Sequence, residues 1–503
     1  MTPVSDAAGT VVATGARLRL DTLGRIPAAS APLTRPDELR PGVLHLGLGA
    51  FHRAHQAVYT EAAMAAAGGD WGIVAVAPRS RDVLTRLTAQ DGLFSVLTLS
   101  AGPPTARVVG AITELRHAAS APMAIVDRLA DPEIRVVTLT VTEKAYRLTP
   151  ATGRLQADDA VTADLTTERP PTTLPGLLAR GLLARYRADA GPLAVVSCDN
   201  LPANGRLLGA AIRQAVELAG PPAALTWLAE NVTFPATMVD RIVPAATAET
   251  VATTRAVLGV TDLATVSAEP FSQWVIEDAF PAGRPAWDQV GAVLTDDVAP
   301  WERLKLRVLN GVHSTLAYLG ALDGAETVAD ALTRPGMRAV LTRLVAEDVA
   351  PTLSPPPGVS VDDYAATVLE RFGNPAIGHR TLQIAMDGSQ KLPQRLLGTL
   401  ADLRAVGAEP RWAALSLAAW MRFVRGRADD GRELPLSDPK AELLRAALAA
   451  APDTPDGVAS ALLGCAEVVP PALADDPVVR GLVTEWLTVL DRHGVTGALD
   501  AAG

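Results

Sequence analysis

Short, mostly apolar runs alternate with stretches of helical pattern in the N-terminal part of this chain. The runs are residues 43–47, 71–77, 134–141 and 193–197, and helix-compatible sequence covers residues 51–67, 174–188 and 207–219. Strands without a polar face are typical of a parallel sheet that helices cover on both sides, because both faces of each strand are then buried. The alternation therefore predicts an α/β fold with a parallel sheet.

A mainly helical pattern takes over near residue 290. It covers residues 304–322, 328–348, 361–371, 394–405, 410–427 and 440–450, and Pro- or Gly-rich joints such as residues 354–358 separate these stretches. We therefore expect three parts in the chain of 503 residues. They are an N-terminal arm over residues 1–40, an α/β domain over residues 41–290 and a mainly α-helical domain over residues 291–503.

The net charge of −10 comes without any basic run. Nucleic acid and anionic membranes attract clustered Lys and Arg, so neither partner is expected. No uncharged apolar stretch reaches the ~18 residues of a membrane span, and the N-terminus lacks a signal-peptide pattern. Cys198 and Cys465 form no CxxC pair, which favours the reducing cytoplasm and gives no structural zinc site. We expect a cytoplasmic monomer or small homo-oligomer without a bound metal.

A glycine-containing turn follows the first apolar run and opens the first helical stretch. In such a turn Gly47 permits the tight bend, Gly49 lets the backbone approach a pyrophosphate, and the helix N-terminus supplies N–H donors. The pattern favours a dinucleotide-binding domain of the Rossmann type, but His52 replaces the usual third glycine, so a plain strand–helix turn is the alternative. The candidate cofactor-binding residues of the turn are Gly47, Gly49, Ala50, Phe51, His52 and Arg53.

Arg79 and Asp82 follow the second apolar run. An acid at this place binds the free 2′-hydroxyl of NAD, whereas an arginine accommodates the 2′-phosphate of NADP. Both residues are therefore candidates for cofactor binding, and the expected cofactor is NAD, with NADP as the alternative.

Lysine is scarce, since only Lys144, Lys305, Lys391 and Lys440 stand among 45 basic residues. Arginine is effectively always protonated, whereas a desolvated lysine can lose its proton near neutral pH and act as a base. A high-GC genome also depletes lysine. Scarcity alone therefore leaves a functional and a compositional explanation open.

Lys305, Asn310 and His313 interrupt an otherwise apolar helical stretch. On an α-helix they fall at about 0°, 140° and 80° around the axis, with Asn310 about 7.5 Å and His313 about 12 Å beyond Lys305, so they share one face. A neutral lysine can take the hydroxyl proton of an alcohol, while Asn and His donate to the oxygen as a carbonyl forms. The alternative is a helix with one snorkelling lysine and two satisfied core polar residues.

Asn200, one of five asparagines, stands just past the fourth apolar run. Open α/β sheets bind ligands at the carboxyl ends of their parallel strands. Asn200 is therefore a candidate site residue, with an Asx turn as the alternative.

Seven segments together resemble the mannitol dehydrogenase family, the polyol-specific long-chain dehydrogenases and reductases. They are residues 47–56, 140–144, 197–200, 234–244, 269–271, 305–313 and 387–393. The resemblance covers nearly the whole chain. It implies a Rossmann-type N-terminal domain with a mainly α-helical C-terminal domain, a cleft between them, and metal-independent hydride transfer between NAD(P) and a sugar alcohol or sugar acid.

The resemblance also implies roles for individual residues. Lys305 matches the catalytic base, Asn310 and Asn200 match the residues that bind and polarise the reacting oxygen, and His313 matches a substrate-positioning donor. The residues that match the family's substrate cleft are Asp240 and Lys391.

Two branches of the family compete as the match for this chain. Residues 142–146 and 379–395 look like the fructuronate reductases, which interconvert D-mannonate and D-fructuronate, whereas the other branch oxidises polyols such as mannitol to fructose. A substrate carboxylate would suit Lys144 or Arg380, although an ion pair of Lys144 with Glu143 or another acid is the alternative. We expect an enzyme for a small sugar acid or polyol; a non-catalytic dinucleotide-binding protein is the alternative from a different class.

Overall fold

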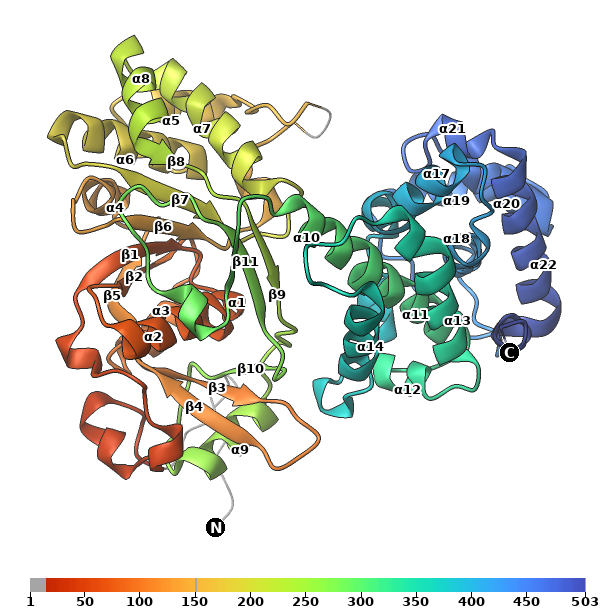
Figure 1. Ribbon diagram of the computed structural model, residues 1–503, viewed down its shortest axis with the longest axis horizontal. Coiled ribbons are helices and arrows are strands. Elements are labelled where there is room, and N and C mark those ends of the chain that lie inside the picture. The colour runs from red at the N-terminus through yellow and green to blue at the C-terminus, as the bar shows by residue number, and fades with distance from the viewer. Residues whose placement is uncertain (1–14, 150–151, 503) are drawn as a thin grey trace, which may run out of the picture. The chain divides into compact units, whose positions relative to one another are not determined.

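The computed structural model describes residues 15–149 and 152–502 (Figure 1). The described residues fall into two compact units, one that ends at Val298 and one that begins at Ala299. The first unit contains the strands of the described chain, and the second is built from helices (Figure 1).

The main sheet of the first unit is parallel throughout and has the strand order β5-β2-β1-β6-β7-β8. Its strands are β1 (Pro41–Leu46), β2 (Gly72–Ala77), β5 (Ile112–His117), β6 (Val136–Leu139), β7 (Leu193–Ser197) and β8 (Val232–Thr233). Numbered within this sheet alone, the order is 3-2-1-4-5-6, the order of doubly wound dinucleotide-binding folds. The predicted Rossmann-type fold is confirmed, and the order reverses between β1 and β6.

Helices cover both faces of this sheet, as the apolar strands predict. One face of β1 and β2, with Val43 and Ile73, packs on α1 (Ala50–Ala54), α2 (Gln56–Ala67) and α3 (Asp82–Thr88). The other face, with Leu44 and Val74, packs on helices of the opposite layer. These helices are α4 (Pro122–Leu129), α5 (Asp159–Thr166), α6 (Leu174–Ala188), α7 (Asn204–Ala219) and α8 (Pro222–Asn231).

Two small sheets that the sequence did not predict complete the first unit. One has the order β10-β3-β4 and the other the order β12-β11-β9. Their strands are β3 (Phe94–Thr98), β4 (Thr105–Val109), β10 (Val266–Ala268), β9 (Thr237–Asp240), β11 (Gln273–Glu277) and β12 (Val293–Thr295). Leu18 and Ile26 of the predicted arm pack in the cluster with α9 (Ala248–Leu258), β3 and β4. Residues 1–14 of that arm lie outside the described residues.

In the described residues of the second unit, helices are joined by loops and turns, without a named strand. Its α-helices are α10 (Ala299–Leu304), α11 (Gly311–Leu322), α12 (Val328–Leu332), α13 (Met337–Arg343), α14 (Val361–Phe372), α15 (Thr381–Ala385), α16 (Gly388–Leu392), α17 (Gly398–Ala405), α18 (Arg411–Val424), α19 (Ala441–Ala449), α20 (Pro455–Leu463), α21 (Pro471–Ala474) and α22 (Pro477–Asp500). All residues of α11 are buried, so this helix forms the centre of the unit.

Three segments of the second unit are π-helical, and they lie within or at an end of stretches predicted as single helices. They are η6 (Lys305–Asn310), η7 (Leu344–Val349) and η10 (Pro393–Leu397). Single π-turns inside α-helices occur often at functional sites. Among the helices of the described residues, none combines the length and apolar character that crossing a membrane requires.

Candidate functional site

The glycine turn after β1 is held by Thr140, which directly follows the neighbouring strand β6. Gly47 has φ = +116°, and a Cβ atom on it would lie 1.8 Å from the carbonyl oxygen of Thr140. The Thr140 hydroxyl donates a 2.8 Å hydrogen bond to the Gly47 carbonyl. Only glycine fits this position, and the turn lies where the strand order reverses, which is where doubly wound sheets bind nucleotides.

Gly49 leaves open space beside the backbone at the start of α1. It is exposed and has φ = −94°, and a Cβ atom would meet no atom closer than the Gly47 oxygen at 3.8 Å. Ala50 and Phe51, which follow it, are half-buried. A ligand can therefore approach the main chain at Gly49 more closely than a side chain would allow.

The side chains of His52 and Arg53 stabilise the turn from the protein interior. The His52 ring is fully buried and stacks on the His45 ring at 3.4 Å, and burial lowers the pKa of His52 well below its usual value. Arg53 Nε donates to the Gly49 carbonyl at 3.2 Å, and its guanidinium also donates to the Ala264 carbonyl. The side chains of His52 and Arg53 thus hold the turn in place. Gly49, followed by the half-buried Ala50 and Phe51, forms the accessible part of the turn.

The first helix breaks where the sequence predicted a continuous one over residues 51–67. His55 has φ = −129° and ψ = −87°, which ends α1 before α2 begins. Its Nε2 atom lies 3.0 Å from the carbonyl oxygen of Gln273 in β11. The tertiary contact holds the break, which sequence periodicity does not reveal.

Arg79 and Asp82 lie on the surface just past the end of β2. The Arg79 carbonyl lies 2.9 Å from His117 Nε2 at the end of β5, and Asp82 is the first residue of α3. The neighbouring Arg81 guanidinium donates to Ser120. A guanidinium and a carboxylate therefore both follow β2, as the sequence predicted.

Lys144 and Asn200 follow neighbouring strands of the main sheet. Lys144 is exposed in the 3-10 helix η4 (Glu143–Tyr146), and its ammonium forms no ion pair with the residues that the structure describes. Tyr146 donates to Asp199, and its hydroxyl lies 2.6 Å from that of Ser197. Burial raises the pKa of Asp199 to about 7. This network ties η4 to the loop that carries Asn200.

Asn204 is a buried residue that the sequence analysis did not select. Its amide donates to the carbonyls of Asp199 at 3.0 Å and Thr237 at 2.9 Å, and it accepts from the Thr237 N–H at 3.0 Å. Asn204 therefore joins the Asn200 loop to β9, whose last residue is the buried Asp240. Its signal was available, because asparagine is scarce and Asn204 stands four residues after Asn200.

Lys305, Asn310 and His313 are all buried at the start of the central helix of the second unit. Lys305 and Asn310 are the ends of η6, where backbone N–H groups bond five residues back. Asn310 thus stands one wide turn beyond Lys305, whereas an α-helix would separate the two by about 140°. Gly311 permits a close approach here, since a Cβ atom on it would lie 3.1 Å from the Arg395 carbonyl oxygen.

His313 is neutral and keeps one ring nitrogen without a partner. Its ring stacks on Phe372 at 4.4 Å and lies 5.1 Å from the ring of His379. Burial lowers its pKa well below the usual value, and electrostatic interactions with His379 and Arg395 act in the same direction. Within residues 15–149 and 152–502, His313 Nε2 has no hydrogen-bond partner.

Basic side chains of the segment 391–395 lie close to His313. Lys391 Nζ donates to the Met386 carbonyl at 2.5 Å, and burial, followed by the charge of Arg395, lowers its pKa to about 8. Arg395 Nη1 donates to Ser314 Oγ at 3.0 Å. The sequence analysis selected Lys391 and passed over Arg395, which stands four residues later on the same helical segment.

Arg380 occupies a different environment from these two residues. It is exposed at the N-cap of α15, directly after His379. No described residue pairs with its guanidinium.

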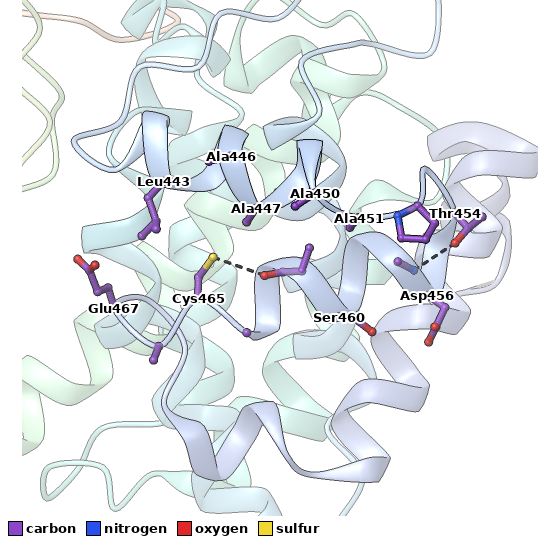
Figure 2. A pocket seen from close by; sticks show the side chains of 15 residues that line it. Leu443, Ala446, Ala447, Ala450, Ala451, Thr454, Asp456, Ser460, Cys465 and Glu467 are labelled. Atoms are coloured by element: carbon purple, nitrogen blue, oxygen red, sulfur yellow. Dashed lines mark hydrogen bonds between the residues drawn. The ribbon is translucent and has the colours of Figure 1, made fainter.

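A hollow in the second unit lies apart from these candidates. It has a volume of about 770 Å³, and Figure 2 shows it between α19 and α20, lined largely by small side chains such as Ala446 and Ala450. Cys465 faces it and lies 3.5 Å from the Ala461 carbonyl. None of the candidate residues lines this hollow. The described part of the chain also contains no group of three His, Cys, Asp or Glu side chains placed to hold a metal ion.

Comparisons with known proteins match both units. A model described as the mannitol dehydrogenase Rossmann domain matches residues 41–289, and one described as the mannitol dehydrogenase C-terminal domain matches residues 297–488. In Escherichia coli (strain K12), a D-mannonate oxidoreductase is 42% identical over 420 residues, which cover 82% of this chain and 86% of that protein. The uncharacterized oxidoreductase YeiQ of the same organism is 41% identical over 92% of this chain and 94% of its own length.

A solved structure has the same fold over nearly the whole chain. The ternary complex of Pseudomonas fluorescens mannitol 2-dehydrogenase with NAD and D-mannitol superposes with a TM-score of 0.83 at 35% identity. The match covers 96% of this chain and 99% of that one.

Proposed function

The chain belongs to the mannitol dehydrogenase family of oxidoreductases, which act on CH–OH groups of polyols or sugar acids, and we propose that it interconverts D-mannonate and D-fructuronate with NAD as cofactor. The similarity to a D-mannonate oxidoreductase at 42% identity supports this substrate pair. The basic side chains beside His313 support it independently, because they suit an anionic substrate.

The turn at Gly47 and Gly49 fits a dinucleotide. The open space at Gly49 is where a Cβ atom would obstruct a pyrophosphate, and the turn lies at the reversal of the strand order. Gly49, Ala50 and Phe51 would hold the pyrophosphate, and Arg79 or Asp82 would contact the adenosine ribose. The bound nicotinamide supplies the acceptor for the hydride in the oxidising direction.

Polar residues of the chain bind the reacting oxygen and remove its proton. Neutral Lys305 takes the hydroxyl proton of the alcohol, and the amides of Asn310 and Asn200 donate to the oxygen as it becomes a carbonyl. Neutral His313 positions the substrate through Nε2. The observation that carries this proposal is the buried, unpartnered His313 Nε2 beside the π-helical turn of Lys305 and Asn310. Asp240 and Lys391 are the further substrate-contacting residues proposed.

A steady-state screen tests the substrate and the base together. D-fructuronate and D-fructose are offered with NADH and with NADPH, and we expect the fastest turnover with D-fructuronate and NADH. Lys305→Ala should lower kcat by about 10²–10⁴-fold, the usual contribution of a general acid–base group, with NADH affinity retained. Lys440→Ala is the matched control, since this lysine pairs with Glu467 on the surface. Near-normal turnover by Lys305→Ala would contradict the assignment of the base.

The same screen separates the alternatives. Faster reduction of D-fructose than of D-fructuronate would move the function to the mannitol-oxidising branch, which the likeness to the mannitol 2-dehydrogenase structure supports. Cofactor binding without turnover of any ketose would point to a non-catalytic dinucleotide-binding protein. Location in the cytoplasm and the oligomeric state stay predictions.

A further inference from the structure

We infer that Arg395 binds the carboxylate of the substrate and thereby sets the preference for a sugar acid over a neutral polyol. This inference rests on the proposed function, and it assigns to Arg395 the role that Lys144 or Arg380 was expected to have from the sequence.

The guanidinium lies beside the proposed substrate-positioning histidine. Arg395 Nη1 donates to Ser314 Oγ at 3.0 Å, and Ser314 directly follows His313 on α11. The close approach at Gly311, where a Cβ atom would lie 3.1 Å from the Arg395 carbonyl oxygen, fixes η10 against the start of α11. Both ends of the Arg395 residue, backbone and side chain, are thus held against the segment that carries Asn310 and His313.

Most donors of Arg395 remain available for a ligand. A guanidinium offers five N–H donors in a planar fork. Ser314 is the one hydrogen-bond partner of Arg395 among the described residues, and no carboxylate of that part of the chain pairs with it. The side chain is nevertheless half-buried, and burial lowers its pKa. A partly desolvated guanidinium without a counterion favours an anionic ligand, and a carboxylate matches its fork geometry.

The neighbouring groups reinforce the positive charge at this place. The ammonium of Lys391 precedes Arg395 by four residues, and His313 and His379 lie beside the pair as neutral rings because burial lowers both of their pKa values. Asp387 and Asp438 act on Lys391 and raise its pKa, but neither is among the groups that act on Arg395. The charge of Arg395 is therefore the less compensated of the two.

The order of the groups along the chain fits the substrate. D-fructuronate carries its carboxylate at the opposite end of the carbon chain from the reacting carbonyl. Lys305, the proposed base, stands at the start of η6, while Ser314, which holds the guanidinium, stands nine residues further along the same helical stretch on α11. The proposed base and the proposed carboxylate-binding group are therefore separated along this stretch, as are the reacting carbon and the carboxylate of a six-carbon acid.

The two residues expected from the sequence to bind the carboxylate are less suited to it than Arg395. Lys144 and Arg380 are both exposed. An ion pair in water is screened and contributes little to affinity, whereas a partly buried guanidinium contributes more. Arg395 is therefore the strongest carboxylate-binding group among the three.

The test compares a sugar acid with its neutral counterpart. For each variant, kcat/KM is measured with D-fructuronate and with D-fructose, and the ratio of the two values is the readout. Arg395→Gln should lower this ratio about 100-fold, because a charge-assisted bidentate contact is lost. Arg395→Lys keeps the charge without the fork and should lower the ratio about tenfold. Ser314→Ala releases the guanidinium from its partner and should give a fall of similar size.

Control variants make the outcome decisive. Arg445→Gln removes an exposed arginine from α19 and should leave the ratio unchanged. An unchanged ratio in Arg395→Gln, or a larger fall in Lys144→Gln or Arg380→Gln, overturns the assignment while the proposed function stands. If Arg395→Gln loses both activities, Arg395→Lys and Ser314→Ala decide, and wild-type ratios in both reject the role. Failure of the wild-type enzyme to reduce D-fructuronate would instead reject the proposed function.

Discussion

Replacing Gly49 by alanine separates cofactor binding from folding. The backbone at Gly49 is extended, with φ = −94° and ψ = −178°, which alanine adopts without strain. The added methyl would have no protein atom closer than 3.8 Å. Alanine is a weaker N-cap than glycine, at a cost of about 0.5–1 kcal/mol, but it lowers the entropy of the unfolded chain by about 0.4–1 kcal/mol. These two effects nearly cancel.

Gly49→Ala should therefore unfold close to the wild-type temperature. A net change within about 1 kcal/mol corresponds to at most about 2–4 °C in a domain of this size. The affinity for NADH should fall much further, because the methyl occupies the space through which a pyrophosphate would reach the main chain. Loss of one or two hydrogen bonds to a charged phosphate, at about 1.5–3 kcal/mol each, weakens binding by about 100-fold or more.

Two further glycine variants serve as controls for this experiment, in which NADH is titrated by fluorescence and unfolding is followed thermally. Gly24→Ala adds a methyl with no neighbour within 4 Å and should change neither measurement. Gly47→Ala should fail to fold normally, because its Cβ atom would overlap the Thr140 carbonyl oxygen at 1.8 Å. Wild-type NADH affinity in Gly49→Ala would refute the placement of the pyrophosphate at this turn. Normal stability of Gly47→Ala would refute the steric reasoning itself.

Two other predictions concern pH and stability. Because burial lowers the pKa of Lys391 to about 8, its ammonium is charged below pH 8 and neutral above it. KM for D-fructuronate should therefore rise as pH increases through 8, and Lys391→Arg, which stays charged, should flatten that rise; a wild-type KM that is constant from pH 7 to 9.5 would exclude this role. Asn204→Ala leaves backbone groups of Asp199 and Thr237 without partners, so urea unfolding should show a loss of about 1–3 kcal/mol. Asn231→Ala, which removes a half-buried amide at the end of α8, should cost less, and equal losses would contradict the bridging role.

The sequence predicted the main sheet because its strands carry their signal locally. The run 193–197 coincides with β7, and the stretch 174–188 coincides with α6. The strands β3, β4 and β10 escaped prediction, although β3 and β4 are as long as β7. Apolar runs of this length do not distinguish a strand from part of a buried helix. What makes them strands is their pairing with one another, for example Val266 with Val96, which are far apart in the sequence.

The predicted helix boundaries of the second unit were wrong for a similar reason. Residues 304–322 were predicted as one α-helix, but they divide into α10, η6 and α11. A π-turn within a helix leaves the apolar pattern of the sequence almost unchanged, so the pattern does not reveal it. The predicted angles between Lys305 and Asn310 therefore assumed α-helical geometry, which does not apply to this segment. The residue types for the site were visible in the sequence, whereas their mutual arrangement depended on a local hydrogen-bond shift.

The residues that sequence reasoning passed over are recognised by their three-dimensional contacts. Asn204, Tyr146 and Arg395 stand among other polar residues in the sequence, and nothing in their immediate neighbours distinguishes them. Their positions become significant only through partners that are distant in the sequence, such as Thr237 for Asn204 and Ser314 for Arg395. Scarcity of a residue type identifies some of them, as it does for asparagine, but arginine is too common in this chain to give the same signal.

The buried histidines beneath the glycine turn determine which groups can produce a pH dependence. Burial lowers the pKa of His45 to about 3 and that of His52 well below its usual value, so both rings are neutral at pH 7. The turn that they support therefore keeps one charge state across the range in which the enzyme would be assayed. Asp199, with a pKa raised to about 7, and Lys391, with a pKa lowered to about 8, do change charge in that range. Lys391 is a proposed substrate contact and does not belong to the cofactor turn, so a pH effect on KM for the sugar acid with unchanged NADH affinity is the expected pattern.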